Sequence, residues 1–265
     1  MPDLNYALIT GASSGIGECF ARALAPRGWN LVLTARSQEK LEGLARDLSG
    51  RHAVRIEPVP TDLGVEGAAG QLVQVLRARG LEIDLLINNA GFGAQGEFWK
   101  LPLERQSEML RLNIQALVEL THELVPAMVE RRHGAIINVS STAGFQPVPY
   151  TTVYSATKAF VTSFSMALEE ELARYGVKVV TLCPGGTRTN FFDAGQYRRR
   201  SLPGGLQAPE KVVERALKAL DRGGGLVIPR WLNKLSIESQ RLVPRRLVVK
   251  IAGDLFRPSR LDDGD

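Results

Sequence analysis

The feature that most limits how this chain can fold is a regular alternation of short apolar runs with longer helical segments. The runs are continuous and rich in Val, Ile and Leu, which is typical of strands covered on both faces. Strands separated by helices favour a parallel sheet with helices on both sides. The expected strands are Leu4–Thr10, Asn30–Thr34, Arg55–Val59, Ile83–Asn88, Ala135–Ser140, Val177–Cys183 and Leu226–Ile228.

The segments between these strands predict the helices: Gly15–Arg27, Gln38–Leu48, Val65–Arg79, Leu103–Arg131, Thr152–Tyr175 and Pro209–Leu220. Pro126 is expected to kink the long fourth helix. The predicted fold is one Rossmann-like α/β domain over residues 1–230, a doubly wound parallel sheet of about seven strands. A basic helical extension follows over residues 231–265, and a charged stretch at about 190–208 predicts a flexible substrate loop.

Composition points to an ordinary soluble protein with 44% hydrophobic and 23% charged residues. No apolar run approaches the roughly 18 residues of a membrane helix, and no secretory signal is recognised near Met1. Cys19 and Cys183 are far apart, so we expect two reduced thiols in a cytoplasmic protein. The histidines, His52, His122 and His133, lack metal-ligand spacing, so no metal is expected.

Positive charge is concentrated near the end of the chain, where residues 222–260 hold nine Lys/Arg and two Asp/Glu. Three interpretations stay open. The tail is a solvated helix face packed on the domain or a partner, it lies on an anionic membrane surface with Trp231 and Phe256 as anchors, or it attracts an anionic substrate such as an acyl thioester carrier. No nucleic-acid-binding module accompanies the charge, so nucleic acid is not an expected partner.

The first predicted strand leads into a glycine-rich turn, Thr10-Gly-Ala-Ser-Ser-Gly-Ile-Gly17, which opens the first helix. Glycines permit a tight turn and let backbone N–H groups approach a pyrophosphate, and the helix N-terminus then faces the anion. The spacing is Gly-x-x-x-Gly-x-Gly. At this place in a strand–turn–helix unit it predicts a dinucleotide site.

Tyr154 and Lys158 are four residues apart at the start of a predicted helix, so they share one helix face. A lysine this close favours the phenolate and is expected to lower the pKa of the tyrosine. A tyrosine with a lowered pKa is a useful proton donor near neutral pH. On its own this pair is a common pattern.

Taken together, the motifs resemble the short-chain dehydrogenase/reductase family, in particular a bacterial subgroup of undefined substrate. The resemblance covers residues 4–190 and rests on motifs in the family's order and spacing: Thr10–Gly17, Asn88-Asn-Ala-Gly91, Asn113, Ser140-Ser141, Tyr154-x-x-x-Lys158 and Pro184-Gly185. It implies hydride transfer between a nicotinamide and a carbonyl or carbinol carbon.

The resemblance also implies the catalytic roles. Tyr154 is the general acid, Lys158 lowers its pKa and holds the nicotinamide ribose, Ser141 binds the substrate oxygen, and Asn113 links Lys158 to solvent through a water. Spacing to Tyr154 favours Ser141 over Ser140, which we interpret as a structural turn residue.

Arg36 decides the predicted cofactor. An acidic residue at the end of the second strand would bind the ribose 2′-hydroxyl, but Ala35 and Arg36 stand there, and a guanidinium suits a 2′-phosphate. NADP(H) is therefore expected, with Ser13 or Ser14 assisting. Asp62 either contacts the adenine, as in the family, or caps a helix. The predicted cofactor residues are Gly11, Ser13, Ser14, Gly15, Ile16, Gly17, Arg36, Asp62, Asn89, Ala90, Gly91, Tyr154, Lys158, Pro184, Gly185, Thr187 and Thr189.

The predicted function is NADPH-dependent reduction of a ketone, or oxidation of a secondary alcohol. An aromatic pocket would suit an apolar ketone, or the same aromatics pack locally. The candidate aromatics are Phe92, Phe145, Tyr150, Phe191, Phe192 and Tyr197, and Ser141 is a further candidate substrate-binding residue. The alternatives are a catalytically silent NADP(H) sensor and an isomerase or epimerase using the same tyrosine and lysine. By analogy, a homodimer or homotetramer is expected.

Overall fold

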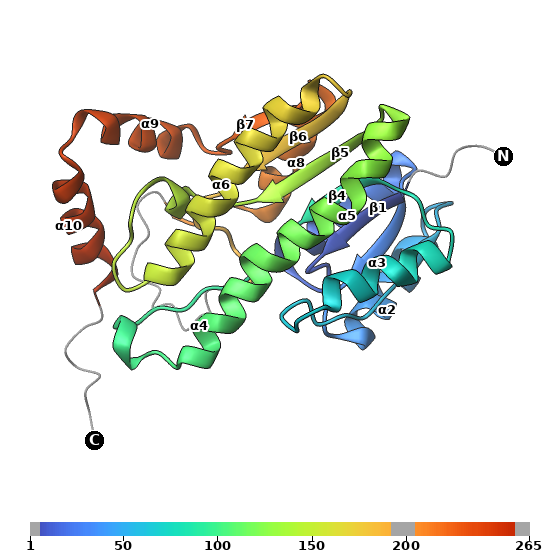
Figure 1. Ribbon diagram of the computed structural model, residues 1–265, viewed down its shortest axis with the longest axis horizontal. Coiled ribbons are helices and arrows are strands. Elements are labelled where there is room, and N and C mark those ends of the chain that lie inside the picture. The colour runs from blue at the N-terminus through green and yellow to red at the C-terminus, as the bar shows by residue number, and fades with distance from the viewer. Residues whose placement is uncertain (1–5, 192–204, 258–265) are drawn as a thin grey trace.

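Seven parallel strands form one sheet in the order β3-β2-β1-β4-β5-β6-β7 (Figure 1). The computed structural model describes residues 6–191 and 205–257. The strands are β1 (Tyr6–Thr10), β2 (Asn30–Thr34), β3 (Ile56–Pro58), β4 (Ile83–Asn88), β5 (Gly134–Val139), β6 (Val177–Leu182) and β7 (Gly225–Val227). The predicted doubly wound α/β fold is confirmed.

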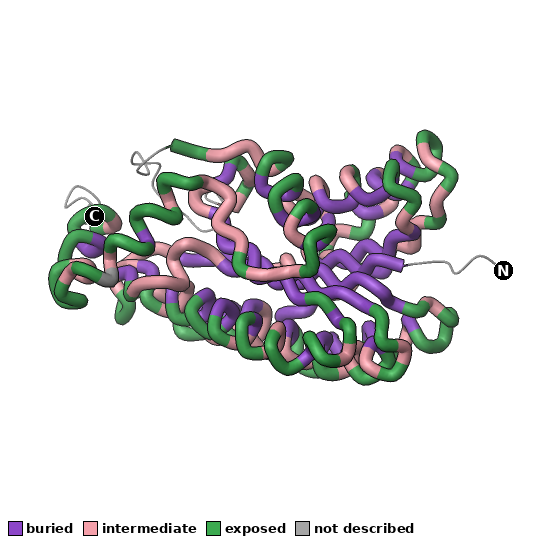
Figure 2. The backbone as a smooth tube through the Cα atoms, turned by 90° about the horizontal axis from the view of Figure 1, so that it is seen from above, coloured by how far each residue is buried: buried purple, intermediate pink, exposed green. Residues whose placement is uncertain are grey.

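Helices cover both faces of the sheet, and successive strand residues supply the two cores. Helices α1 (Gly15–Leu24), α2 (Gln38–Ser49) and α8 (Pro209–Asp221) cover one face, where Ile9 of β1 is buried. On the other face α3 (Ala68–Ala78), α5 (Ala116–Arg131) and α6 (Thr152–Ala173) bury the adjacent Leu8. Figure 2 shows the buried central strands between half-exposed helices.

The strand order reverses direction between β1 and β4, which pair in parallel. The loops that leave the carboxyl ends of these two strands go to opposite sides, and in open α/β sheets a crevice opens at such a point. Thr10 ends β1 and Asn89 follows β4. The side chain of Asn89 donates to the carbonyl of Thr10 over 2.8 Å and so ties the two loops together.

The predicted helix over 103–131 is in fact three segments. They are α4 (Leu103–Leu110), a π-helical turn η3 (Arg111–Gln115) and α5, which continues through Pro126. The irregular turn therefore lies ahead of the position where proline suggested a kink. A π-helical turn holds one residue more than an α-helical turn. Asn113 lies in this turn, and its side chain is hydrogen-bonded to the backbone of Phe92.

The basic extension forms α9 (Trp231–Ser239), the turn η5 (Gln240–Leu242) and α10 (Arg245–Phe256). It packs on the domain: the backbone at Gly253 faces Pro149, and the Gln95 side chain donates to the carbonyl of Phe256 over 2.9 Å. A domain boundary at residue 230 stays a prediction. No helix in the described ranges has the length and apolar character needed to cross a bilayer. The short helical turns η1 (Ala25–Arg27), η2 (Phe98–Lys100) and η4 (Thr142–Phe145) lie in connecting segments.

Candidate active site

A cavity of about 500 Å³ opens at the carboxyl ends of the central strands. It brings together most of the residues predicted from the sequence, although they are spread over 180 positions of the chain. The predicted residues that line it are Gly11, Ser13, Ser14, Gly15, Ile16, Arg36, Asp62, Asn89, Ala90, Gly91, Phe92, Ser141, Tyr154, Lys158, Pro184, Gly185, Thr187, Thr189 and Phe191.

The glycine-rich turn forms one wall of this cavity. Gly11 and Gly15 have φ values of +65° and +60°, which favour glycine. Ser14 precedes α1 and its side chain makes no capping hydrogen bond to the helix. The first N–H groups of α1 are thus left to an anion. Gly17 does not line the cavity; a Cβ there would lie 2.4 Å from the carbonyl oxygen of Gly11, so this glycine lets α1 approach the turn.

Thr10 and Asn89 hold the floor of the cavity in place. The Thr10 hydroxyl accepts hydrogen bonds from the backbone N–H groups of Asn89 and Ala90, both over 2.9 Å. It also donates to the carbonyl of Ile87 over 3.1 Å. The small residues Ala90 and Gly91 then leave the backbone open to a ligand.

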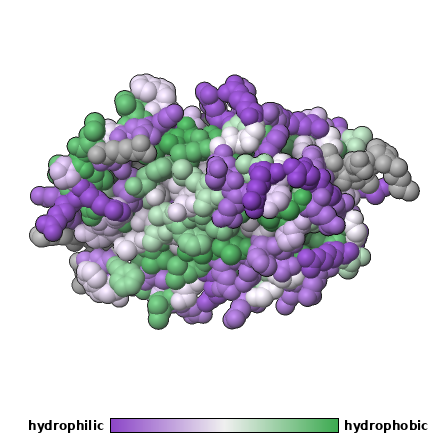
Figure 3. Space-filling view, turned by 45° about the horizontal axis from the view of Figure 1, so that its top comes forward, coloured by the Kyte–Doolittle hydropathy of each residue, from purple (hydrophilic) through white to green (hydrophobic). Residues whose placement is uncertain are grey.

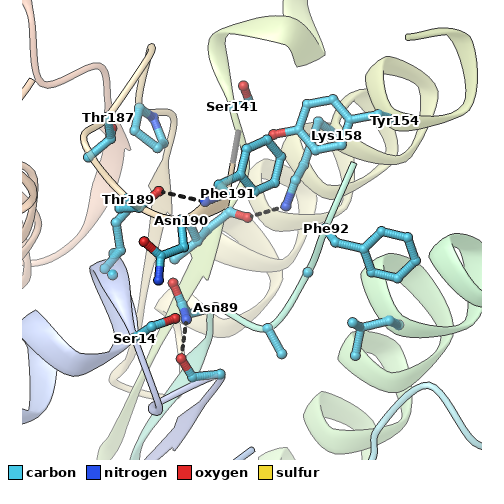
Figure 4. A pocket seen from close by; sticks show the side chains of 18 of the residues that line it. Ser14, Asn89, Phe92, Ser141, Tyr154, Lys158, Thr187, Thr189, Asn190 and Phe191 are labelled. Atoms are coloured by element: carbon cyan, nitrogen blue, oxygen red, sulfur yellow. Dashed lines mark hydrogen bonds between the residues drawn. The ribbon is translucent and has the colours of Figure 1, made fainter. Parts of the chain in front are cut away.

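Tyr154, Ser141 and Lys158 gather at the opposite side of the pocket, together with Phe191 (Figure 4). Tyr154 and Lys158 come from the first turns of α6, and Ser141 follows β5 and caps η4. The side chains of Ser141 and Tyr154 both line this part of the cavity. The Lys158 ammonium is buried, lies 5.8 Å from the ring centre of Tyr154, and donates to the carbonyl of Val139 over 2.8 Å.

Burial sets the pKa values of this pair. It raises the pKa of Tyr154 to about 12, against a smaller lowering by the hydrogen bond from Ser141. It lowers the pKa of Lys158 to about 8. The pKa of Tyr154 is therefore raised and not lowered, opposite to the predicted direction, because burial disfavours the phenolate. Lys158 is bonded to a backbone carbonyl instead.

Ser140 and Ser141 have different surroundings. The Ser140 hydroxyl donates to the carbonyl of Lys158 over 2.8 Å and shares a hydrogen bond with the Thr162 hydroxyl over 2.7 Å. Its hydrogen bonds are therefore made to other groups of the protein. The Ser141 oxygen accepts from the N–H of Ala143 over 3.1 Å and faces the cavity near Tyr154. This arrangement agrees with a structural role for Ser140.

Asn113 is buried and does not line the cavity. Its side chain accepts from the N–H of Phe92 over 3.1 Å and donates to the carbonyl of the same residue over 3.0 Å. It also donates to the Thr157 hydroxyl over 3.1 Å. A Cβ at Gly91 would lie 2.8 Å from the Asn113 oxygen and 3.6 Å from the Lys158 nitrogen, so these groups lie around one glycine.

The far end of the cavity carries positive charge. Arg36 lines it with a largely exposed side chain, 3.7 Å from the carboxylate of Glu108. Asp62 lines it too, and one of its oxygens accepts from the N–H of Gly64 over 3.0 Å. Lys40, on the first turn of α2, was missed by the sequence reasoning although its spacing of four residues from Arg36 could have indicated it.

Residues near Tyr154 form an apolar wall. Phe191 lies 5.3 Å from Tyr154 between ring centres, and Phe92 is stacked under the Arg105 guanidinium at 3.7 Å. Phe145 and Tyr150 are not among the lining residues; Tyr150 has a left-handed backbone (φ 64°). Phe192, Tyr197 and most of the predicted loop at 190–208 lie outside the described residues. Lining residues that sequence reasoning missed include Leu112, Val148, Thr151 and Phe256.

The segment after β6 forms the remaining wall. Pro184 and Gly185 line the cavity, and a Cβ at Gly185 would lie 2.2 Å from the side-chain nitrogen of Asn233, so α9 backs this wall closely. The Thr187 hydroxyl donates to the carbonyl of Gly185 over 3.0 Å. The Thr189 hydroxyl accepts from the N–H of Phe191 over 3.3 Å. In the part of the chain that the structure describes, no group of His, Cys, Asp or Glu could hold a metal ion.

Comparison with known proteins places this geometry in a family. Residues 5–198 match the family model described as short chain dehydrogenase. A very-long-chain 3-oxoacyl-CoA reductase of Macaca fascicularis is 34% identical over 219 residues, covering 81% of this chain and 68% of the relative. This chain spans 65% of two fungal reductases of the same name.

Two solved structures are similar over nearly the whole chain. A short-chain dehydrogenase from Sphingobium yanoikuyae, solved in complex with NADPH, has a TM-score of 0.81 and 32% identity, covering 99% of both chains. A bulky-bulky ketone specific alcohol dehydrogenase from Comamonas testosteroni has a TM-score of 0.77 and 33% identity, covering 91% of this chain and 94% of that one. The chain is an oxidoreductase and belongs to the short-chain dehydrogenase family.

Proposed function

We propose that this enzyme reduces the keto group of an apolar substrate with NADPH, and that 3-oxoacyl thioesters are the favoured class. One observation carries the proposal. Ser141 and Tyr154 lie beside buried Lys158 in a cavity whose other end presents the N-terminus of α1 and the cations Arg36 and Lys40. That layout suits a nucleotide at one end and a carbonyl group at the other.

NADP(H) is the cofactor, as predicted; the Sphingobium relative was solved with NADPH. The residues of this chain fit it. The turn from Gly11 to Gly15 would hold the pyrophosphate, and Arg36 with Lys40 would hold the 2′-phosphate. Pro184, Gly185 and Thr187 would lie along the nicotinamide. When bound, the cofactor supplies a hydride to the carbonyl carbon.

Tyr154 supplies the matching proton. Its hydroxyl is buried and neutral at physiological pH, since burial raises its pKa, so it can donate a hydrogen bond to the carbonyl oxygen and then its proton as negative charge develops there. Ser141 would donate a second hydrogen bond to the same oxygen. Lys158, held by the carbonyl of Val139, would place positive charge near the tyrosinate that forms. The carbonyl becomes a carbinol.

The apolar wall supports the substrate class. Phe92, Phe191, Val148 and Phe256 surround the space next to Tyr154, and burial of an alkyl or aryl group there is favourable at about 0.8 kcal/mol per CH₂. The relatives named as 3-oxoacyl-CoA and bulky-ketone enzymes support an apolar ketone. A long acyl thioester uses the pocket for its chain and leaves its polar carrier outside.

The test is NADPH oxidation, followed by its absorbance, with 3-oxoacyl-CoA thioesters of increasing chain length, bulky aromatic ketones and steroid ketones. We expect kcat/KM to rise with acyl chain length. The variant Tyr154→Phe should lose about 10²–10⁴-fold in kcat while still binding NADPH. Tyr150→Phe is the matched control, because Tyr150 is close in sequence and does not line the cavity.

Turnover by Tyr154→Phe within a few fold of the wild type would contradict the assigned acid. Tight NADPH binding with no turnover of any carbonyl would favour a cofactor sensor, and interconversion of stereoisomers without net NADPH use would favour an epimerase. A cytoplasmic location stays a prediction. A homodimer or homotetramer is likewise proposed.

A further inference from the structure

We propose that the outer face of α9 and α10 is a docking surface for an anionic lipid bilayer. This C-terminal face, residues 230–257, forms one end of the molecule (Figure 1). Within it, exposed apolar side chains alternate with basic ones, and Figure 3 shows hydrophobic and hydrophilic groups side by side at that end. The proposal concerns binding to a surface and does not depend on the reductase chemistry.

Large apolar side chains are unusually exposed on this face. Trp231 is 70% exposed and Leu242 is 89% exposed. On α10, Leu247 and Ile251 are one helical turn apart and 47% and 59% exposed, and Leu255 continues the same row. The opposite side of α10 is buried against the domain at Ala252 and Gly253. One side of the helix thus packs on the domain, and the other side presents a row of apolar side chains to solvent, as interfacial helices do.

A row of cations lies next to the apolar row. Arg246 and Lys250 are one turn apart and precede Leu247 and Ile251 by one residue, so the two rows are adjacent on the helix. Arg245 is also exposed. Residues 230–257 hold seven Lys/Arg and two Asp/Glu. Each of these cations near an anionic membrane adds to the attraction.

The charge favours a lipid surface over a second copy of this chain. In a two-fold interface the same patch meets itself, so this face would bring like charges together at short range. An anionic headgroup layer complements the cations, and the acyl boundary beneath it accepts the row of Leu247 and Ile251.

The docking face adjoins the pocket. Phe256, the last residue of α10, lines the cavity, and its carbonyl is held by Gln95. The same helix therefore presents one face outward and ends at the apolar wall beside Tyr154. A bilayer bound at this face would lie next to a site suited to apolar molecules.

The experiment is co-sedimentation of the full-length protein with vesicles of phosphatidylcholine alone or of equal parts phosphatidylcholine and phosphatidylserine. We expect binding to the anionic vesicles only, weakened by salt. The triple variant Arg245→Gln, Arg246→Gln, Lys250→Gln should lower the partition coefficient by roughly 10- to 100-fold. The double variant Leu247→Ser, Ile251→Ser should lower it by at least about 10-fold, since two apolar side chains lose their burial.

A matched control variant removes three positive charges from another part of the surface. Arg46, Arg51 and Arg79 lie on or after α2 and α3, at the other end of the molecule, and make exposed ion pairs of little value to stability. The triple variant Arg46→Gln, Arg51→Gln, Arg79→Gln should bind anionic vesicles like the wild type. Circular dichroism and NADPH binding report whether each variant is folded.

Three outcomes overturn the proposal. The first is no binding of the wild type to anionic vesicles. The second is equal loss of binding in the control triple, which would mean that net charge alone attracts the protein. The third is a smaller particle mass for Leu247→Ser, Ile251→Ser in solution, which would make this face a contact between copies.

Discussion

Lys158 is a charged group whose burial costs the folded protein stability. Burial lowers its pKa in the folded protein from 10.5 to about 8. At pH 7 the side chain is therefore still charged although it is buried away from water. Lys158→Met removes that cost and loses the bond to Val139. We expect the variant to be inactive and more stable at pH 7 by about 2 kcal/mol, after allowing about 1 kcal/mol for the lost bond. Urea unfolding measures this.

The extra stability of Lys158→Met over the wild type should depend on pH between 8 and 10.5. Between pH 8 and 10.5 the unfolded chain binds more protons at Lys158 than the folded chain, so the stability of the wild type rises with pH there. The advantage of Lys158→Met is therefore full below pH 8 and shrinks as pH approaches 10.5. A difference that stays constant across this window, or a less stable variant at pH 7, would contradict the argument.

Arg36 and Lys40 predict how the protein distinguishes its cofactors. Both line the same end of the cavity, and two charge-assisted contacts to a 2′-phosphate contribute about 1.5–3 kcal/mol each. Arg36→Gln with Lys40→Gln should weaken NADPH binding by roughly 100-fold or more and leave NADH binding within a few fold. Cofactor fluorescence titration measures both constants. Arg46→Gln, on the same helix as Lys40, is the control, and an equal loss for the two cofactors would exclude a 2′-phosphate role.

Sequence reasoning found residues that sit in short motifs and missed those that the fold brings in. The turn at Gly11–Gly17 and the pair Tyr154 and Lys158 are local patterns on predictable elements. Phe256 reaches the cavity only because α10 folds back over Pro149. The pKa of Tyr154 had the opposite direction to the prediction, because burial is a tertiary quantity that a spacing of four residues does not reveal.

At the scale of elements, one side chain joins the π-helical turn η3 to two other segments. Asn113 satisfies both the N–H and the carbonyl of Phe92 and also bonds Thr157. Asn113→Ala leaves these buried groups without that partner, and each such group costs about 1–3 kcal/mol. We expect a loss of about 2–4 kcal/mol in the free energy of unfolding, measured in urea.

Thr157→Val is the control for this prediction, because it keeps the volume of the side chain and removes only one of the three hydrogen bonds of Asn113, together with the bond from the Thr157 hydroxyl to the carbonyl of Tyr154. It should cost about 1–2 kcal/mol and leave the bonds between Asn113 and Phe92 in place. Equal stability of Asn113→Ala and wild type would mean that Phe92 finds other partners. KM for the ketone should rise in Asn113→Ala, since Phe92 lines the substrate wall, while a purely global loss of stability would leave KM unchanged.

The sheet was the most predictable level of structure, because each buried strand is a continuous apolar run bounded by turn residues. Helix ends were less predictable. Helix α3 starts at Ala68 and not at Val65, since Gly67 ahead of it has a left-handed backbone (φ 76°). The packing of the last helices on their own domain was not predictable from local sequence. It depends on contacts between residues far apart in the sequence, such as that of Asn233 with Gly185.

At the scale of the whole molecule, α6 predicts how copies of the chain assemble. Phe160 and Met166 are 39% and 47% exposed on its outer side, and Phe160 stacks on Phe164 with ring centres 5.9 Å apart. Aromatic residues and Met are enriched in interfaces. We propose that α6 pairs with the α6 of a second copy in a homodimer. The C-terminal face lies outside this interface.

The double variant Phe160→Glu, Met166→Glu should convert that assembly to monomers, because like charges would then face each other across a two-fold axis. Mass photometry across protein concentrations measures the state, and a folded monomer should keep its circular dichroism. Val65→Glu, which changes a more exposed apolar residue outside α6, should leave the mass unchanged. If the Phe160 and Met166 variant keeps the wild-type mass, the copies meet elsewhere, and if the wild type is already monomeric, α6 is not an interface.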